Sequence, residues 1–219
     1  MAEGDPYAEV SMGTTNFALK YAGGVLIASD SRTSRGTFIE DRNAHKMIDI
    51  SPATDVFGGV WVVRAGTAAH TQMLTRYAHD YLCFHAMELA EGQPLRLRTV
   101  ATLFQAMVYP NKNALSVGLL LTNGREVLSV HRSGAVFEHA LFAAQGSGSL
   151  YVDALLKSRA REGLSLAEAE QIAREALAYS VDTDAASGGN LVLVDVREDG
   201  SSTKKIVFNA ELRATLAHA

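Results

Sequence analysis

The apolar pattern of this chain switches repeatedly between strand and helix periods, and the resulting order of elements constrains its fold. Strand patterns cover residues 15–21, 25–29, 46–50, 60–64, 115–121, 126–130, 136–143, 191–196 and 205–208. Helix patterns cover residues 67–89, 100–108, 150–159 and 165–181. Because the helices come in neighbouring pairs, without regular strand–helix alternation, a doubly wound parallel sheet is disfavoured. The order predicts an α+β, four-layer αββα sandwich, with two antiparallel sheets between helix pairs.

Local signals refine these elements. The apolar face of the first helix is marked, at helical spacing, by Met73, Tyr77, Tyr81 and Phe84. Asn123 and Gly124 predict a type I′ hairpin turn, and residues 136–143 are expected to extend the same sheet as one strand. Ser165 and Glu168 have the spacing of a capping box, which predicts the start of the last long helix.

Composition excludes several classes of protein. The 219 residues favour one domain, and a hydrophobic content of 47% is enough for a sizeable core. The net charge of −4 and the lack of a basic block argue against nucleic acid or an anionic membrane as partner. Residues 1–13 are acidic without an apolar core, unlike a secretory signal, and no apolar run approaches the ~18 residues of a membrane span. We expect a soluble intracellular protein.

Cysteine and histidine provide no candidate metal site. The single cysteine, Cys83, allows no intrachain disulfide, fits a reducing compartment, and is interpreted as a core thiol rather than a nucleophile. His70, His79 and His85 are spaced so that they do not share one helix face. No metal and no cofactor is therefore expected.

The step from Gly13 to Thr14 opens the first strand and offers a chemical possibility. Cleavage between these residues would give Thr14 a free α-amine, whose pKa of ~8 lets it accept a proton near neutral pH. A threonine that carries its own base is a known form of activated nucleophile. The alternative is that Thr14 only begins a strand, where β-branched residues are favoured.

Two charged residues could assist such a nucleophile. Asp30 ends the apolar strand of residues 25–29, and Lys46 begins another strand. A charge at either place is costly unless it is paired, and each could pair with the other. A buried cation beside Thr14 would also lower the pKa of the threonine hydroxyl. The alternative is a pair of solvated strand-end charges.

Glycine-containing turns could complete the site. Residues 146–149 could bind an anion through backbone amides and serine hydroxyls, or simply cap a helix. In residues 184–189, Asp184 could hold Ser187 or orient a proton carrier, or the segment could be a helix-end turn. Gly66, before the first helix, could present a backbone N–H to an oxyanion.

Together these segments resemble a known family. The resemblance is carried by residues 13–15, 23–32, 46, 64–69, 146–149 and 184–189. Over about residues 14–208 the chain resembles a β-type subunit of the 20S proteasome, an N-terminal-nucleophile hydrolase. The resemblance implies that Thr14 is the nucleophile once residues 1–13 are removed as a propeptide. Thr14 would remove them itself by attacking the carbonyl of Gly13, with Asp30 and Lys46 as the charge pair beside it.

The same resemblance assigns supporting roles. Ser147, Asp184 and Ser187 would position the amine of Thr14 and a proton-carrying water, and the N–H of Gly66 would stabilise the oxyanion. Residues 64–72 and 84–89 look most like the β1 subunit, with caspase-like specificity. Arg64 would then line the floor of the primary specificity pocket and favour cleavage after Glu or Asp. An inter-subunit or surface salt bridge is the alternative for Arg64.

Further substrate contacts implied by the resemblance are Thr33, Ser34 and Ala68. The implied partners are other β subunits in a heptameric ring, α-ring subunits, the opposite β ring and unfolded polypeptide substrates, in the cytoplasm and nucleus. A noncatalytic structural subunit of the same ring is the competing hypothesis, and another amide hydrolase of the class is a third.

The chain departs from the family pattern in three places. Residues 51–59 form a longer loop, Thr183 stands where many relatives have Arg, and Asn190 replaces a more usual apolar residue. The loop makes the register of Arg64 depend on a gap, and Thr183 puts the network around Asp184 in doubt.

Overall fold

The computed structural model describes residues 13–35, 38–52, 59–89, 93 and 95–216. It contains two five-stranded sheets in which every strand pair is antiparallel. In order across the first sheet lie β10 (Phe142–Gln145), β1 (Asn16–Tyr21), β2 (Gly24–Asp30), β11 (Leu191–Arg197) and β12 (Ser202–Val207). The second sheet contains β5 (Met47–Asp49), β6 (Trp61–Gly66), β7 (Val117–Thr122), β8 (Val127–Val130) and β9 (Val136–His139). The prediction of antiparallel sheets combined with helices is confirmed.

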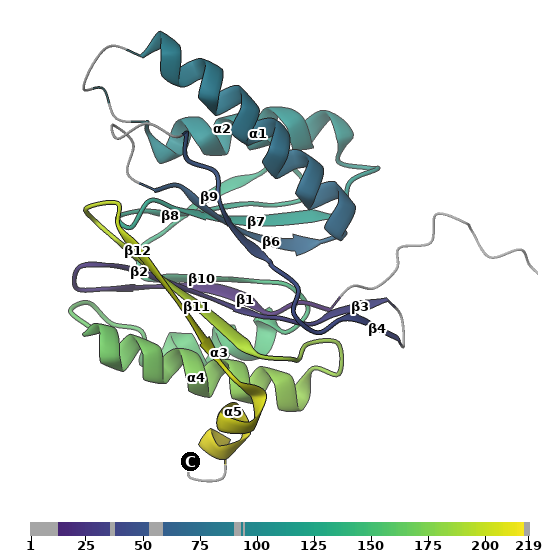
Figure 1. Cartoon of the computed structure of the whole chain (residues 1–219), viewed down its shortest axis with the longest axis vertical. Coiled ribbons are helices and arrows are strands. Elements are labelled where there is room, and N and C mark those ends of the chain that lie inside the picture. The colour runs from purple at the N-terminus through teal and green to yellow at the C-terminus, as the bar shows by residue number, and fades with distance from the viewer. Residues whose placement is uncertain (1–12, 36–37, 53–58, 90–92, 94, 217–219) are drawn as a thin grey trace, which may run out of the picture.

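The helices lie on the outer faces of the sheets. Figure 1 shows α1 (Ala68–Glu88) and α2 (Leu97–Val108) over the second sheet, and α3 (Ser149–Arg159) and α4 (Leu166–Thr183) over the first. A 3₁₀ turn (Tyr109–Asn111) follows α2, and the short α5 (Asn209–Leu216) contacts α4. None of the helices within the described residues is long and apolar enough to span a bilayer.

Three hydrophobic clusters separate these elements. Strand β2 illustrates the arrangement, since Leu26 and Ala28 pack with the α3–α4 side while Val25 and Ile27 face the second sheet. Strand β7 alternates in the same way, with Leu120 toward the first sheet and its neighbours toward α1 and α2. Because β2 is a central strand covered on both faces, every one of its residues is buried. Such a strand needs a nearly continuous apolar run.

The predicted apolar face of α1 is wrong, because the large side chains of that face are exposed: Met73, Tyr77, Tyr81 and Phe84. The face that packs on the second sheet instead carries Leu74, Ala78 and Leu82, together with two threonines. Thr75 can be buried because its hydroxyl donates to the carbonyl of Thr71 at 2.9 Å. The buried face of α1 therefore consists of small or hydrogen-bonded residues together with two leucines. The prediction was misled because the larger aromatic residues of the exposed face are also spaced at a helical period.

The single strand predicted for residues 136–143 is also wrong. Strand β9 pairs with β8 in the second sheet, whereas β10 pairs with β1 in the first. The chain crosses between the sheets at residues 140 and 141, which belong to neither strand. The two strands differ in burial, since β9 has two exposed residues whereas β10 is buried or half-buried, but a local sequence period carries no signal for a crossing between sheets.

Two turn predictions have different outcomes. The capping box is confirmed, since Ser165 and Glu168 exchange side-chain and backbone hydrogen bonds at the start of α4. Strands β7 and β8 form the expected hairpin, but its loop is not the predicted type I′ turn. That turn needs a positive φ at both central residues, and of the two only Gly124 has one. The carboxamide oxygen of Asn123 instead accepts the backbone N–H groups of Arg125 and Glu126.

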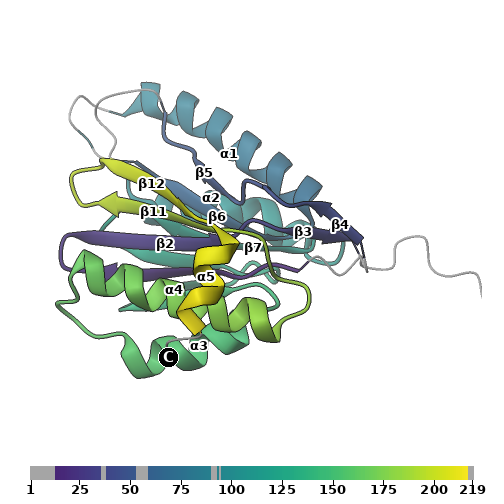
Figure 2. The ribbon, with the colours of Figure 1, turned by 60° about the horizontal axis from the view of Figure 1, so that its bottom comes forward.

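The sequence did not predict a hairpin formed by β3 (Thr33–Arg35) and β4 (Phe38–Asp41). It also did not predict helix α5. Figures 1 and 2 both place this hairpin at the end of the molecule where β6 ends and α1 begins. The strands of the hairpin are short and β4 is exposed, so its residues show no clear alternation. The hairpin nevertheless forms one wall of the candidate site.

Candidate active site

Thr14 lies just before β1, and its hydroxyl faces the carbonyl of the preceding residue. The side chain is buried, and Oγ1 donates a hydrogen bond to the carbonyl oxygen of Gly13 at 2.7 Å. Gly13 is sterically required here, because a Cβ atom would lie 2.1 Å from the carbonyl oxygen of Ala186. The peptide bond between Gly13 and Thr14 therefore lies beside the Thr14 hydroxyl, which is the candidate nucleophile.

Lys46 and Asp30 form a buried ion pair beside Thr14. The ammonium Nζ of Lys46 lies 2.6 Å from Asp30 Oδ1 and 3.1 Å from Thr14 Oγ1, and it reaches the Gly13 carbonyl oxygen at 3.4 Å. The backbone N–H groups of Thr15 and Gly188 donate to the two carboxylate oxygens of Asp30. These contacts replace the solvation that burial removes from the carboxylate.

Burial lowers the pKa of Lys46, and the neighbouring charge of Asp30 partly opposes that effect. The ammonium stands where it can stabilise negative charge on Thr14 Oγ1, or on the Gly13 oxygen. Solvated strand-end charges, the alternative for Asp30 and Lys46, are therefore contradicted by the structure.

The two glycine-containing turns meet on the other side of Thr14. Its backbone N–H donates to Ser147 Oγ at 3.1 Å, and Ser147 donates to Asp184 Oδ2 at 2.7 Å. Ser187 donates to the same carboxylate oxygen at 2.7 Å. Burial alone would raise the pKa of Asp184, but hydrogen bonds from Ser147 and Ser187 and from the backbone lower it. The network keeps an ionised acceptor behind the nitrogen of Thr14.

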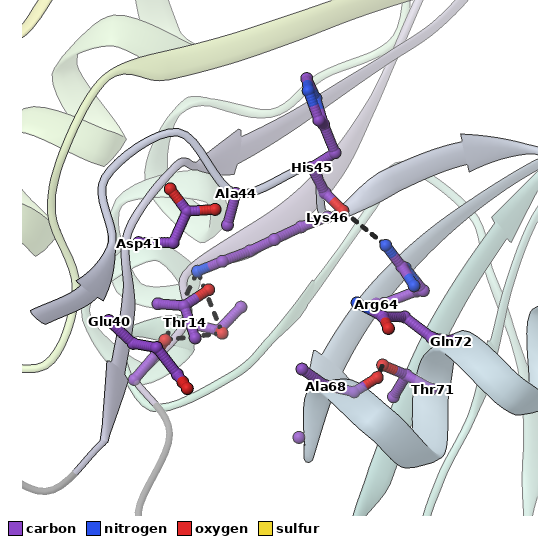
Figure 3. Close-up of a pocket in the computed structure, with 13 residues that line it drawn as sticks. Thr14, Glu40, Asp41, Ala44, His45, Lys46, Arg64, Ala68, Thr71 and Gln72 are labelled. Carbon is purple, nitrogen blue, oxygen red and sulfur yellow. Dashed lines mark hydrogen bonds between the residues drawn. The ribbon is translucent and has the colours of Figure 1, made fainter.

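A pocket with a volume of about 490 Å³ opens at Thr14. Its lining includes Lys46 and Arg64, together with Thr33 and Ala68, which the resemblance implies as substrate contacts. Figure 3 shows Arg64 across the pocket from Thr14, with its guanidinium donating to the carbonyl oxygen of His45. Burial lowers the pKa of Arg64, yet a guanidinium keeps its charge at neutral pH. Ser34 is not part of the pocket lining, because its hydroxyl donates to Ala186 instead.

Gly66 closes the pocket at the end of β6. Its φ of 99° lies in the region that favours glycine, and a Cβ atom would lie 2.4 Å from the carbonyl oxygen of Ser116. A side chain at this position would therefore collide with the backbone at the start of β7. Gly66 lines the same pocket as Thr14 and Gly13, which is where an oxyanion donor is needed.

Comparisons with known proteins give the family of the chain. The family described as "Proteasome subunit" matches residues 10–196. The chain belongs to the proteasome subunit family. It is 33% identical over 201 residues to the probable proteasome subunit beta type-1 of Schizosaccharomyces pombe, covering 90% of this chain and 85% of that protein. The proteasome subunit beta type-6 of Arabidopsis thaliana is 32% identical over 87% of this chain and 80% of its own length.

The proteasome subunit beta type-1 of Saccharomyces cerevisiae is 29% identical over 91% of this chain and 90% of its own. These relatives confirm the resemblance to a β-type proteasome subunit, most like β1.

The structure also adds residues that the sequence reading did not select. Thr15 Oγ1 lies 2.6 Å from Ser187 Oγ and 2.7 Å from Ser180 Oγ, which extends the hydroxyl network into the core. Ser180 precedes Asp184 by four residues, a helical spacing that could have indicated the shared face. Glu40 and Asp41 line the pocket from β4, and only the unpredicted hairpin brings them there.

The structure describes two of the three departures from the family pattern and part of the third. Residues 53–58 of the longer loop lie outside the described residues. Thr183 donates to the carbonyl oxygen of Tyr179 at 2.9 Å, so its hydroxyl points back along α4 rather than into the Asp184 network. Asn190 accepts the backbone N–H of Asn209, which links the start of β11 to α5. Among the described residues, no cluster of His, Cys, Asp and Glu could hold a metal ion.

Proposed function

We propose that this chain is a threonine endopeptidase subunit of a 20S proteasome core, with Thr14 as its nucleophile. The observation that carries the proposal is the position of Lys46 Nζ, within 3.1 Å of Thr14 Oγ1 and 2.6 Å of Asp30 in a buried site. A buried, paired cation at a threonine hydroxyl favours the ionised hydroxyl and so supports nucleophilic attack.

The first reaction of the site is removal of residues 1–13 as a propeptide. Thr14 Oγ1 attacks the carbonyl carbon of Gly13, its hydroxyl proton is transferred to the Thr14 nitrogen, and the bond between that carbon and the nitrogen breaks to leave an ester on Oγ1. Water then hydrolyses the ester, which releases the leader and frees the α-amine. The hydrogen bond of 2.7 Å between Thr14 Oγ1 and the Gly13 oxygen supports this step by holding the two groups together.

The free amine then serves as the base in peptide cleavage. It accepts the hydroxyl proton of Thr14 as Oγ1 attacks a substrate carbonyl, and passes this proton to the amine that leaves as the peptide bond breaks. Water then hydrolyses the ester left on Oγ1, which releases the second product and restores the hydroxyl. Lys46 stabilises the developing charge on Oγ1, and the N–H of Gly66 stabilises the oxyanion. Ser147, with Asp184 and Ser187 behind it, already accepts the N–H of Thr14 and would hold the amine.

The same proposal covers the fold and the assembly. Residues 14–219 form a single N-terminal-nucleophile hydrolase domain, a four-layer αββα sandwich with a helix pair outside each sheet. The chain takes its place in a heptameric β ring beside α-ring subunits and the opposite β ring, acts on unfolded polypeptides, and works in the cytoplasm and nucleus. The exposed large apolar residues of α1 support burial against other subunits.

Arg64 sets the specificity of this site. Its guanidinium lines the pocket at Thr14, and its contact with the His45 carbonyl leaves further N–H donors for a carboxylate. An acidic side chain at the cleaved position is therefore preferred. The test is a set of fluorogenic peptides with Glu or Asp, Arg, and Tyr or Leu at that position, assayed on the assembled particle.

Replacing Arg64 with Met should move the preference toward apolar residues. Losing a hydrogen bond to a charged group costs about 1.5–3 kcal/mol, so kcat/KM for the Glu peptide should fall about 10- to 100-fold. Arg98→Met, which removes an exposed cation from α2, should leave that value unchanged. An unchanged acidic preference in Arg64→Met would overturn the assignment. A particle without Thr14-dependent cleavage of any peptide would favour the noncatalytic structural role.

A further inference from the structure

The pocket at Thr14 has charges of opposite sign on its two sides. Arg64 and the first turn of α1 form one side, and β4 contributes Glu40 and Asp41 to the other. Figure 3 shows the two carboxylates on one side of Thr14 and Lys46, with Arg64 on the opposite side. A peptide bound for cleavage at Thr14 must therefore pass between a cationic and an anionic wall.

The two carboxylates on β4 differ in how far they are already engaged. Asp41 Oδ1 accepts the backbone N–H of Asn43 at 2.8 Å, which ties this carboxylate to its own turn. Glu40 is exposed, and no hydrogen bond or ion pair joins its carboxylate to another residue in the described part of the chain. Glu40 therefore retains its full hydrogen-bonding capacity for a ligand in the pocket.

We propose that Glu40 makes this site select peptides with a Lys or Arg side chain within two residues of the acidic residue at the cut. The inference rests on the proposed function, because it needs Thr14 as nucleophile and Arg64 as the acidic-residue contact. An extended peptide advances ~3.3 Å per residue, so a long basic side chain near the cleaved residue can reach across the pocket. The same carboxylate repels a second acidic residue, so runs of acidic residues are disfavoured.

The size of the preference follows from the exposure of Glu40. Ion pairs with an exposed partner are weak. Replacing Lys with Glu in the peptide changes an attraction to Glu40 into a repulsion. We therefore expect kcat/KM for the two peptides to differ by about threefold to tenfold. The difference should shrink as salt is raised, because exposed charges are screened over ~10 Å at 0.1 M ionic strength. The acidic preference at the cleaved position, which depends on Arg64, should persist in Glu40→Gln.

The test uses the assembled particle and internally quenched peptides that all carry Glu at the cleaved position. Lys, Gln or Glu is placed in turn at each of the two residues before and after it. Wild type should show at least one position where Lys exceeds Gln and Gln exceeds Glu, and this order should flatten in Glu40→Gln and reverse in Glu40→Lys. Glu138→Gln, which removes an exposed carboxylate from β9 outside the pocket, should keep the wild-type order.

Two results would overturn the inference, and they differ in what else they affect. Thr14-dependent cleavage after Glu with no Lys-favouring position, or with an unchanged order in Glu40→Gln, removes the role of Glu40 and leaves the proposed function intact. Absence of Thr14-dependent cleavage removes both. Competition between Lys and Glu peptides for binding to a Thr14→Ala particle, with the subunit expressed without residues 1–13 so that no leader fills the pocket, gives a second readout, in which the Lys peptide should bind more tightly and lose this advantage in the Glu40→Gln background.

Discussion

Replacing Thr14 with Ala should abolish cleavage after acidic residues and leave residues 1–13 attached. Both reactions need Oγ1, which lies 2.7 Å from the Gly13 carbonyl oxygen and 3.1 Å from Lys46 Nζ. Removing a covalent nucleophile commonly lowers the rate by roughly 10⁴-fold or more, since the other groups of the site then act on a much weaker attacking group. The measurement is hydrolysis of the Glu peptide by assembled particles.

Thr14→Ser is the matched control for this variant. Serine keeps a hydroxyl at the same atom and loses only the methyl group, so leader removal and part of the peptidase activity should persist. Wild-type activity in Thr14→Ala would show that the nucleophile lies elsewhere. Equal loss in the Ser and Ala variants would point to a packing role for the methyl group.

Replacing Lys46 with Met should have the second largest effect, on both activity and stability. Asp30 would remain buried with two backbone N–H contacts but no cation, and breaking a buried pair in this way costs about 3–5 kcal/mol. Loss of the ammonium beside Thr14 Oγ1 should also lower kcat/KM about 10²- to 10⁴-fold. Thermal unfolding of the particle and the Glu-peptide assay measure the two effects.

Lys157→Met provides the comparison for Lys46→Met. Lys157 forms an exposed pair with Asp153 at the same N–O distance of 2.6 Å, so its loss should cost about 1 kcal/mol or less and leave activity unchanged. If both variants unfolded at the same temperature and retained activity, the claim that the Lys46–Asp30 pair supports the nucleophile would be wrong.

The sequence predicted most of the candidate site because each of its charged or nucleophilic residues adjoins a regular element. Asp30 ends an apolar strand, Asp184 follows a capped helix, and Gly66 ends a strand before a helix. In each case a charged residue that is costly to bury, or a glycine, stands at the end of a regular element. The hydrophobic period of the sequence locates such ends. The resemblance then joined positions that the residues alone had left as separate alternatives.

The unpredicted parts depend on packing between distant segments. On α1, the large apolar side chains are exposed because another face of the helix packs on the second sheet. Between β9 and β10, the chain crosses from the second sheet to the first. A local sequence period specifies neither the face of a helix that packs nor the sheet that a strand joins. Glu40 was missed for a related reason. A short exposed hairpin has little hydrophobic patterning, so its approach to Thr14 emerges only from tertiary structure.

The mass of the intact chain in the assembled particle shows whether Thr14 becomes the first residue of the working subunit. We expect a wild-type chain that has lost residues 1–13 and begins at Thr14. A chain that still carries Gly13 bonded to Thr14, in particles that cleave the Glu peptide, would contradict it.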